Sequence, residues 1–272
     1  MKKLYCIILF LTLTLWAHSQ IPTNNYILTR TMCDSLGVAT IDQIQYYDGL
    51  GRPYLAVLKG AVGGNRHLAS LQEYDTQGRN KCIWLPVCIE QEYNNSYDLK
   101  KKLLETYQDS LAYTSYDYHT LPLDRVTWES GPGKAWVGKG IKNDYFFNIA
   151  SPDSVLSCKK YSVTDGGGRL LYDGYYKANS LSVVCNTDED GYRSYTFKDS
   201  EGRVLLVRSC DGNVFSDTYF VYDSFGRLCY VLPPSYQENE DLDLWAYQYS
   251  YDGLGRCIKK KYPGCDEVSY VY

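Results

Sequence analysis

Apolar and aromatic residues alternate with polar ones along much of this chain, with the period of two that is typical of β-strands. Tyr247, Tyr249 and Tyr251 occupy alternate positions, and so do Tyr195 and Phe197 farther upstream. Alternation of this kind directs one set of side chains to each face of a strand. The pattern therefore predicts a mainly β chain.

A five-residue motif, Asp-x-x-Gly-Arg, follows these alternating segments and occurs six times. Asp favours the first position of a type I turn, and Gly three places later supplies the positive φ that a three-residue hairpin loop needs. The motif therefore predicts tandem antiparallel β-hairpins with a tip at each copy. The turn residues are Asp48, Gly51, Arg52, Asp75, Gly78, Arg79, Asp165, Gly168, Arg169, Asp199, Gly202, Arg203, Asp223, Gly226, Arg227, Asp252, Gly255 and Arg256.

Tyr stands directly before the Asp in four of the six copies. We expect each Tyr to lay its ring over the next hairpin and to keep its hydroxyl in water. The methylene groups of Arg can pack against other side chains, and its guanidinium can donate several hydrogen bonds to a carboxylate or a carbonyl. An anion site formed by these arginines is the alternative reading.

The motif copies resemble the Tyr-Asp (YD) repeats of the RHS, or rearrangement hotspot, family. The hexapeptide Tyr-Asp-Gly-Leu-Gly-Arg stands at both 47–52 and 251–256, and matches extend from about Tyr46 to Tyr272. The segments 188–204 and 244–252 are more specifically similar to the uncharacterised N-terminal region of secreted bacterial RHS-repeat proteins. The resemblance implies successive β-hairpins that wrap around a cargo, often a toxic C-terminal domain, or that present a surface to other cells.

Residues 98–111 interrupt the β pattern with helical spacing. Leu99, Leu103, Leu104, Tyr107 and Leu111 recur at helical spacing, and three lysines at 100–102 occupy the other face. We expect one short amphipathic helix whose apolar stripe covers the sheet. A helix on a membrane surface is the minority alternative.

The N-terminus has the features of a secretory signal peptide over residues 1–19. Lys2 and Lys3 precede an apolar run from Leu4 to Trp16, and Ala17 and Ser19 are the small residues of a cleavage site before Gln20. We therefore expect a protein that is secreted or held at the cell surface, with no transmembrane span after cleavage. Cleavage would leave 26 basic and 32 acidic side chains. This acidic balance argues against nucleic acid as a partner.

The remaining chain is expected to form an N-terminal β region with the helix insertion, 20–165, and a YD-repeat hairpin region, 166–272. A degenerate turn copy at 121–125 carries Asp124, in place of Gly, before Arg125. Asp tolerates positive φ better than most residues do. The chain stops on Tyr272, the Tyr that should introduce another turn, so we expect the hairpin region to be incomplete at its C-terminus.

Nine cysteines remain after cleavage, so at least one is unpaired. Several follow an Arg of the motif on an expected strand, where a small buried hydrophobe fits as well as half of a disulfide. We expect mostly buried thiols with one or two bridges, and the spacing does not indicate which residues pair.

Candidate chemistry is sparse, and the sequence predicts no enzyme, no cofactor and no metal. His67 and His119 are not part of any recognisable catalytic motif. Residues 188–191 match only the first half of a calcium-binding loop. Asp241 and Asp243 could form the acid pair of a glycosidase, but they belong to an acidic run that is typical of solvent-facing charge.

Two functions of different classes remain. The first is an exported, non-enzymatic RHS-repeat scaffold, shell or cell-surface interaction protein, which could be the N-terminal part of a larger polymorphic-toxin-like protein. Its partner would be a protein, either its own C-terminal cargo or another cell-surface protein. The alternative is a secreted protein that binds or cleaves carbohydrate, with glycan held on Trp128, Trp136 and Trp245.

Overall fold

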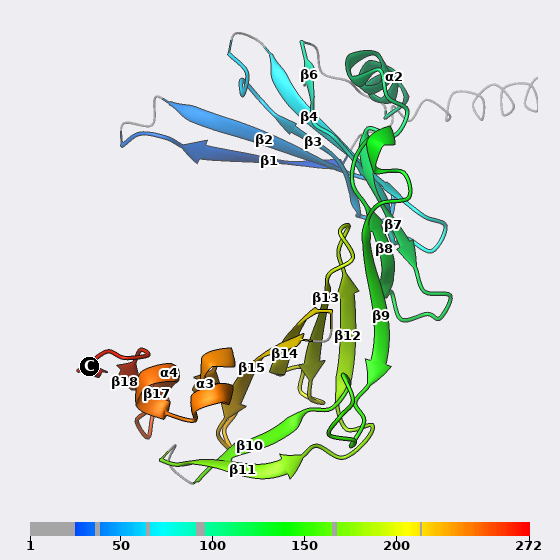
Figure 1. Ribbon diagram of the computed structural model, residues 1–272. Coiled ribbons are helices and arrows are strands. Elements are labelled where there is room, and N and C mark those ends of the chain that lie inside the picture. The colour runs from blue at the N-terminus through cyan, green and yellow to red at the C-terminus, as the bar shows by residue number, and fades with distance from the viewer. Residues whose placement is uncertain (1–24, 36–38, 64–65, 91–95, 165–167, 213) are drawn as a thin grey trace, which may run out of the picture. The chain divides into compact units, whose positions relative to one another are not determined.

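The computed structural model describes residues 25–35, 39–63, 66–90, 96–164, 168–212 and 214–272. Strands dominate these residues and pair antiparallel with their neighbours (Figure 1), so the mainly β prediction is confirmed. The expected signal peptide at residues 1–19 lies outside the described residues. The chain divides into two compact units.

The first unit holds the described residues up to Tyr116 together with Ser130–Val137. Its strands pair in the order β1-β2-β3-β4, and β4 pairs with both β5 and β6. Alternate side chains, such as Leu55 and Val57 on β3, are buried in its core. The elements are β1 (Asn25–Met32), β2 (Thr40–Tyr47), β3 (Pro53–Leu58), β4 (His67–Tyr74), β5 (Asn80–Trp84), β6 (Val87–Ile89), β7 (Tyr113–Tyr118, within this unit up to Tyr116) and the 3-10 turn η2 (Lys134–Trp136).

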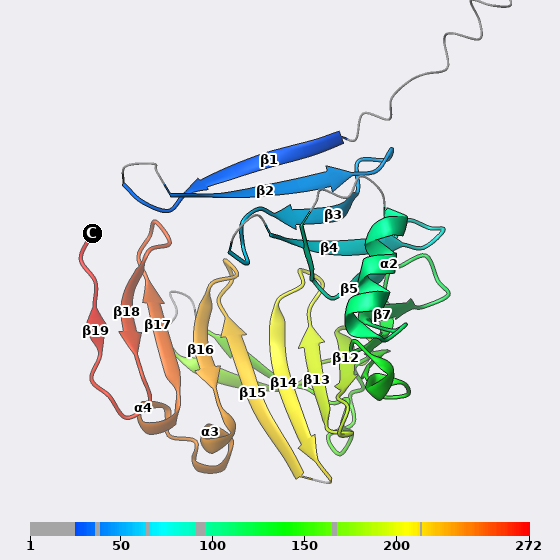
Figure 2. The same cartoon turned by 90° about the horizontal axis from the view of Figure 1, so that it is seen from above.

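Helix α2 (Ser96–Tyr107) packs against the sheet of the first unit (Figure 2). Leu99 and Leu103 are fully buried, as the helical spacing predicts, whereas Leu104 stays exposed. The Lys100 ammonium lies 2.8 Å from a carboxylate oxygen of Glu73 on β4, so this lysine faces the sheet and not only solvent. The helix ends at Tyr107 because Gln108 adopts a positive φ of 50°. Leu111 therefore lies beyond the helix that was expected to include it.

The second unit holds Asp117–Glu129 and Gly138–Tyr272. Its strands pair antiparallel in chain order, except that β9 pairs with β12 and the intervening β10 and β11 form a separate hairpin. The strands are β8 (Val126–Ser130, within this unit up to Glu129), β9 (Ile141–Phe147), β10 (Lys159–Val163), β11 (Leu170–Tyr175), β12 (Ser182–Thr187), β13 (Arg193–Lys198), β14 (Val204–Asp211), β15 (Val214–Tyr222), β16 (Leu228–Leu232), β17 (Tyr247–Tyr251), β18 (Cys257–Lys261) and β19 (Val268–Ser269).

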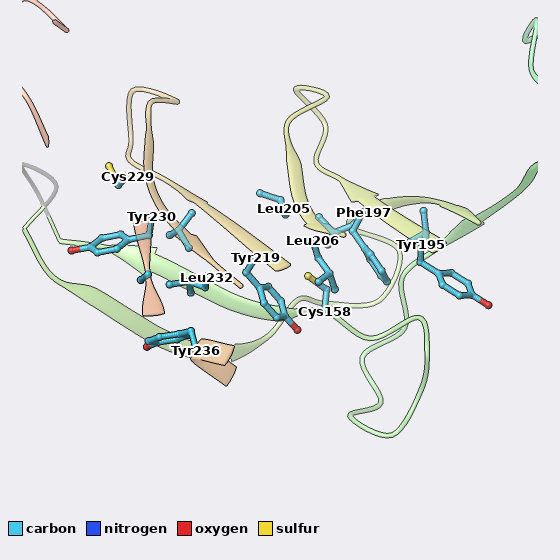
Figure 3. Packing of buried hydrophobic residues seen from close by; sticks show 14 of the residues in the cluster. Cys158, Tyr195, Phe197, Leu205, Leu206, Tyr219, Cys229, Tyr230, Leu232 and Tyr236 are labelled. Atoms are coloured by element: carbon cyan, nitrogen blue, oxygen red, sulfur yellow. The ribbon is translucent and has the colours of Figure 1, made fainter. Parts of the chain in front are cut away.

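One face of the second unit's sheet is covered by the β10–β11 hairpin, which crosses the strands from β12 to β15 in Figure 1. The core between these two layers contains Phe197, Leu206 and Tyr219 from neighbouring strands and Cys158 from the segment before β10. Figure 3 shows Cys158 beside Leu206, with Phe197 and Tyr219 on either side. The two layers bury apolar side chains that a single hairpin could not.

Two further short helices, α3 (Pro234–Asn239) and α4 (Leu242–Trp245), occupy the excursion between β16 and β17. Pro234 stands in the first turn of α3, where its missing N–H costs nothing. The Asp241 carboxylate caps α4 by accepting hydrogen bonds from the backbone N–H groups of Asp243 and Leu244. The acidic run thus forms helix termini.

The expected domain boundary between residues 165 and 166 falls between β10 and β11. These two strands pair with each other, so both belong to the second unit. No helix in the described parts of the chain is long and apolar enough to cross a membrane.

Candidate functional site

The turn at Asp48 illustrates how one copy of the repeated motif is built. The Asp48 N–H donates to the carbonyl of Arg52 at 2.9 Å, and the Gly51 N–H donates to the Asp48 carbonyl at 3.0 Å. Gly51 has a φ of 77°, which a residue without Cβ adopts at little cost. The Asp48 carboxylate accepts hydrogen bonds from the backbone of Leu50 and Arg52. The bond from the Arg52 backbone N–H, with that from its guanidinium, lowers the pKa of the Asp48 carboxyl.

Four further copies repeat this geometry. In each, the Asp N–H donates to the Arg carbonyl at 2.8–3.1 Å, the Gly has a positive φ, and the Arg Nε donates to the Asp carboxylate at 2.7–2.8 Å. The copies are Asp75–Arg79, Asp199–Arg203, Asp223–Arg227 and Asp252–Arg256. The ion pairs are partly exposed, and exposed ion pairs add little to stability. Their main effect is to hold each guanidinium in one orientation.

Consecutive turns are joined through these oriented arginines. The Arg52 guanidinium lies 4.4 Å from the ring centroid of Tyr74, the residue before the next turn. The Tyr74 hydroxyl donates to the carbonyl of Pro53 at 2.6 Å. We call this arrangement the Arg–Tyr interlock: the Arg of one turn, the Tyr that precedes the next turn, and the carbonyl of the residue after that Arg.

The interlock recurs in the second unit. Tyr251 lies 5.0 Å from the Arg227 guanidinium and donates to the Leu228 carbonyl at 2.8 Å. Tyr272 stands in the same relation to Arg256 and to the Cys257 carbonyl. The expectation for the tyrosines was therefore wrong at Tyr74 and Tyr251, whose rings cover the preceding turn and whose hydroxyls donate to the backbone.

The same Arg–Tyr contacts form at the degenerate copy at 121–125, although Tyr145 lies within β9 and not directly before a turn. The Arg125 guanidinium lies 4.8 Å from the Tyr145 ring, whose hydroxyl donates to the Val126 carbonyl at 2.9 Å. Asp124 adopts a φ of 47°, as expected for the residue in the place of Gly. His119 takes the role of the Asp, since its Nδ1 accepts a hydrogen bond from the Leu121 N–H at 3.1 Å.

One predicted copy differs from the others. Asp165 lies outside the described residues, and the hairpin closes instead between Thr164 and Arg169, whose backbone atoms are joined by a 3.0 Å hydrogen bond. The Thr164 hydroxyl accepts from the Arg169 N–H, as the Asp carboxylate does elsewhere. Gly168 is absent from the described glycines with positive φ. An extra residue in the loop moves the turn out of the common register.

A further turn of the same type was missed because it ends in Tyr and not in Arg. The Asp188 N–H donates to the Tyr192 carbonyl at 3.0 Å, and the Asp188 carboxylate accepts from the N–H groups of Asp190 and Tyr192. Gly191 has a φ of 89°. The segment compared above with half of a calcium loop is therefore a hairpin tip. A search for Asp followed three residues later by Gly, without the requirement for Arg, would have identified this turn.

A buried ion pair, which the strand pattern did not predict, secures the layer that covers the second unit's sheet. The Arg208 guanidinium is almost fully buried and donates two 2.7 Å hydrogen bonds to the Asp217 carboxylate. The same guanidinium donates to the carbonyls of Val155 and Ser157, in the segment before β10. Arg208 thus satisfies four acceptors at once, which a buried charge requires.

The second unit also contains a cavity of about 320 Å³ between the β10–β11 hairpin and α3. We call it the tyrosine-lined pocket, because Tyr161, Tyr172 and Tyr236 form its walls. The Gln237 side-chain carbonyl accepts hydrogen bonds from the Tyr161 hydroxyl at 3.2 Å and the Lys159 ammonium at 3.3 Å. The pocket joins segments far apart in the chain, so no local pattern could reveal it.

The candidate catalytic residues have structural partners. His67 Nδ1 accepts a hydrogen bond from the Gly60 N–H at 3.1 Å. Asp241 caps α4, and the Asp243 carboxylate lies 2.6 Å from the Lys261 ammonium. The three tryptophans proposed to hold glycan lie elsewhere than the tyrosine-lined pocket: Trp128 lies on β8, Trp136 in η2 and Trp245 on α4.

None of the nine described cysteines, from Cys33 to Cys265, is bridged. Burial raises the pKa of the Cys82 thiol to about 11 and that of the Cys158 thiol to about 12. These two side chains are therefore protonated and behave as small apolar residues. The expected one or two bridges do not occur among these residues.

Comparison with known proteins gives a domain match and a fold. The family described as a domain of unknown function (DUF6443) matches residues 24–147. No curated protein matches the chain. Two similar solved structures are the crystal structure of TcdB2-TccC3, with 15% identity and a TM-score of 0.50, and the Photorhabdus luminescens Tc holotoxin pore, with 15% identity and a TM-score of 0.51.

These alignments include 90% and 91% of this chain but 12% of each of the other chains. At this identity the likeness shows the fold alone. The comparisons thus give a domain of unknown function over residues 24–147 and a shared fold, and the resemblance to the RHS family rests on the turn motifs.

Proposed function

We propose that this chain is an exported, non-enzymatic RHS-type scaffold whose interlocked hairpins build a shell or a cell-surface interaction module. The observation that supports this most is the recurrence of the Arg–Tyr interlock, from Arg52 with Tyr74 to Arg256 with Tyr272. A contact that links one hairpin to its neighbour allows a sheet to grow by repetition. Growth of this kind suits a wall or a shell.

The face of the second unit's sheet opposite its core supports a protein as the partner. Val184, Thr196, Val207 and Thr218 lie in register across β12 to β15, and each is half-buried. This row mixes apolar and hydroxyl side chains. Such a surface suits contact with another polypeptide, which can bury the methyl groups and pair the hydroxyls. The partner would be the chain's own C-terminal cargo or another cell-surface protein.

The larger protein is part of the same proposal. The chain spans 12% of the chains in the similar solved structures, and we include in the proposal a role as the N-terminal part of a longer polypeptide. We include export in the proposal because residues 1–19 have a basic start and an apolar run.

Cross-linking in the native host tests this proposal. A tagged full-length chain is produced in its host, the cells are fractionated and lysine cross-links are mapped by mass spectrometry. We expect the tag outside the cytoplasm, and cross-links from the Lys198 side of the sheet to one protein. Retention in the cytoplasm, or turnover of a substrate by the purified chain, would overturn the proposal.

A further inference from the structure

The tyrosine-lined pocket contains a polar group that the fold leaves without a partner. The Gln237 Nε2 atom is buried and meets no hydrogen-bond acceptor among the described residues. Buried polar groups are almost always paired, because an unpaired one has lost its hydration without compensation. Gln237 lines the pocket, so a small change in its side-chain torsion angles brings its amide N–H groups to an acceptor that enters the pocket.

The orientation of this amide is determined by its neighbours. The Lys159 ammonium can only donate, and it lies 3.3 Å from Gln237 Oε1. Exchanging the amide oxygen and nitrogen would place a donor against this ammonium. The oxygen must therefore face Lys159 and Tyr161, and the nitrogen must be the group that lacks a partner.

The walls of the pocket offer an aromatic face beside these polar groups. The rings of Tyr161 and Tyr172 meet with centroids 5.6 Å apart, and Tyr172 is 55% exposed. A ring face that is open to solvent can stack against the C–H face of a flat ligand. The pocket thus combines an apolar platform with polar groups that fix orientation, as small-ligand sites do.

The charges at the pocket balance, because Lys159 and Glu240 both line it, so they favour a ligand without net charge. Glu240 lines the pocket, and its positive φ of 53° at the end of α3 fixes its backbone there. Its carboxylate can accept from a ligand hydroxyl, whereas Lys159 and Gln237 Nε2 can donate. A ligand that both accepts and donates, carries no charge and has one flat apolar face satisfies all of these groups.

We propose that the tyrosine-lined pocket binds one neutral sugar ring of a glycan, stacked on Tyr172 and hydrogen-bonded by Gln237, Lys159 and Glu240. The volume of about 320 Å³ is at the small end of ligand sites, which span roughly 300–1,000 Å³, and suits one ring. This activity goes beyond the scaffold proposal and stands independently of it. It would let a surface protein attach to a polysaccharide.

Binding of neutral methyl glycosides to the full-length chain tests the proposal. Saturation-transfer NMR with the methyl glycosides of glucose, galactose, mannose and N-acetylglucosamine gives a Kd for each. We expect saturable binding of at least one sugar. Gln237→Leu and Tyr172→Ala should each weaken it about five- to tenfold, since each removes one hydrogen bond or one stacking surface. The matched controls, Gln77→Leu and Tyr97→Ala, change exposed residues outside the pocket and should leave the Kd unchanged.

Thermal melting without sugar separates binding from folding. Gln237→Leu should lower the Tm, because it also removes the acceptor of the Tyr161 hydroxyl and the Lys159 ammonium, so sugar binding by this variant is measured well below its own Tm. The proposal is overturned if no glycoside binds saturably, or if binding is equal in the pocket variants and their controls. Binding restricted to acidic sugars and strengthened by Glu240→Gln would also contradict it.

Discussion

The interlock between Arg227 and Tyr251 makes a measurable prediction about how consecutive hairpins stabilise each other. Tyr251→Phe removes only the 2.8 Å hydrogen bond to the Leu228 carbonyl and should reduce the free energy of unfolding by about 1 kcal/mol. Arg227→Met removes the contact with the Tyr251 ring, about 0.5–1 kcal/mol. It also removes the ion pair with Asp223, about 0.2–1 kcal/mol. The expected total is about 1–2 kcal/mol.

A double-mutant cycle isolates the contact between the two side chains. Arg227→Met combined with Tyr251→Leu should show a coupling energy of about 0.5–1 kcal/mol, because each single change already breaks the same contact. Arg203→Met combined with Tyr251→Leu is the control, since Arg203 stacks on Tyr222, and its two effects should add. Urea unfolding followed by circular dichroism measures all of these free energies. Additive effects for Arg227 and Tyr251 would show that the interlock does not couple adjacent hairpins.

Three more predictions concern the turns and the covering layer. Gly255→Val should lower the free energy of unfolding by about 1–3 kcal/mol, because a β-branched residue is strained at a φ of 80°. Glu201→Ala, at an exposed turn position, should leave the free energy of unfolding nearly unchanged. Equal decreases for the two variants in urea unfolding would contradict the turn assignment. Arg208→Ala should cost about 3–5 kcal/mol because it leaves the Asp217 carboxylate buried without its partner, and a loss below about 1 kcal/mol would show that the ion pair is dispensable. Burial alone would raise the pKa of Asp223, but the hydrogen bonds from Arg227 outweigh it and lower that pKa. The carboxylate therefore stabilises the fold above its unfolded pKa of about 3.9. Urea unfolding at a series of pH values should show this contribution disappear as the pH falls through the lower folded pKa, and Asp223→Asn should flatten the pH dependence.

The turns were predictable because their chemistry is local. An Asp, a Gly and an Arg within five residues contain both the hydrogen-bond acceptor and the backbone freedom that the hairpin tip needs. The motif could not indicate that Tyr251 covers the preceding Arg227, because that contact depends on how two neighbouring hairpins are placed. The exception at Thr164 arises from an extra loop residue, which the five-residue motif does not contain.

The tyrosine-lined pocket and the buried ion pair were not predictable. Lys159 and Gln237 are 78 positions apart in the chain, and only the packing of β10 beneath α3 brings them together. Arg208 stands at a core-facing strand position where the alternation predicts an apolar side chain. Its burial depends on Asp217 in the next strand and on carbonyls of the covering segment. Both sites depend on contacts between segments that are distant in the chain, and the hydrophobic periodicity of the sequence does not indicate such contacts.

Hydrogen exchange of the turn amides tests most directly whether adjacent hairpins are linked in a ladder. The Gly N–H of each turn donates to the Asp carbonyl, so its exchange rate reports the opening of that hairpin. We expect Arg227→Met to speed exchange at Gly226 and at Gly255, the turns that the interlock joins, and to leave Gly51 unchanged. Faster exchange at Gly226 alone, or an equal increase at all three glycines, would contradict the account of a scaffold built from interlocked neighbours.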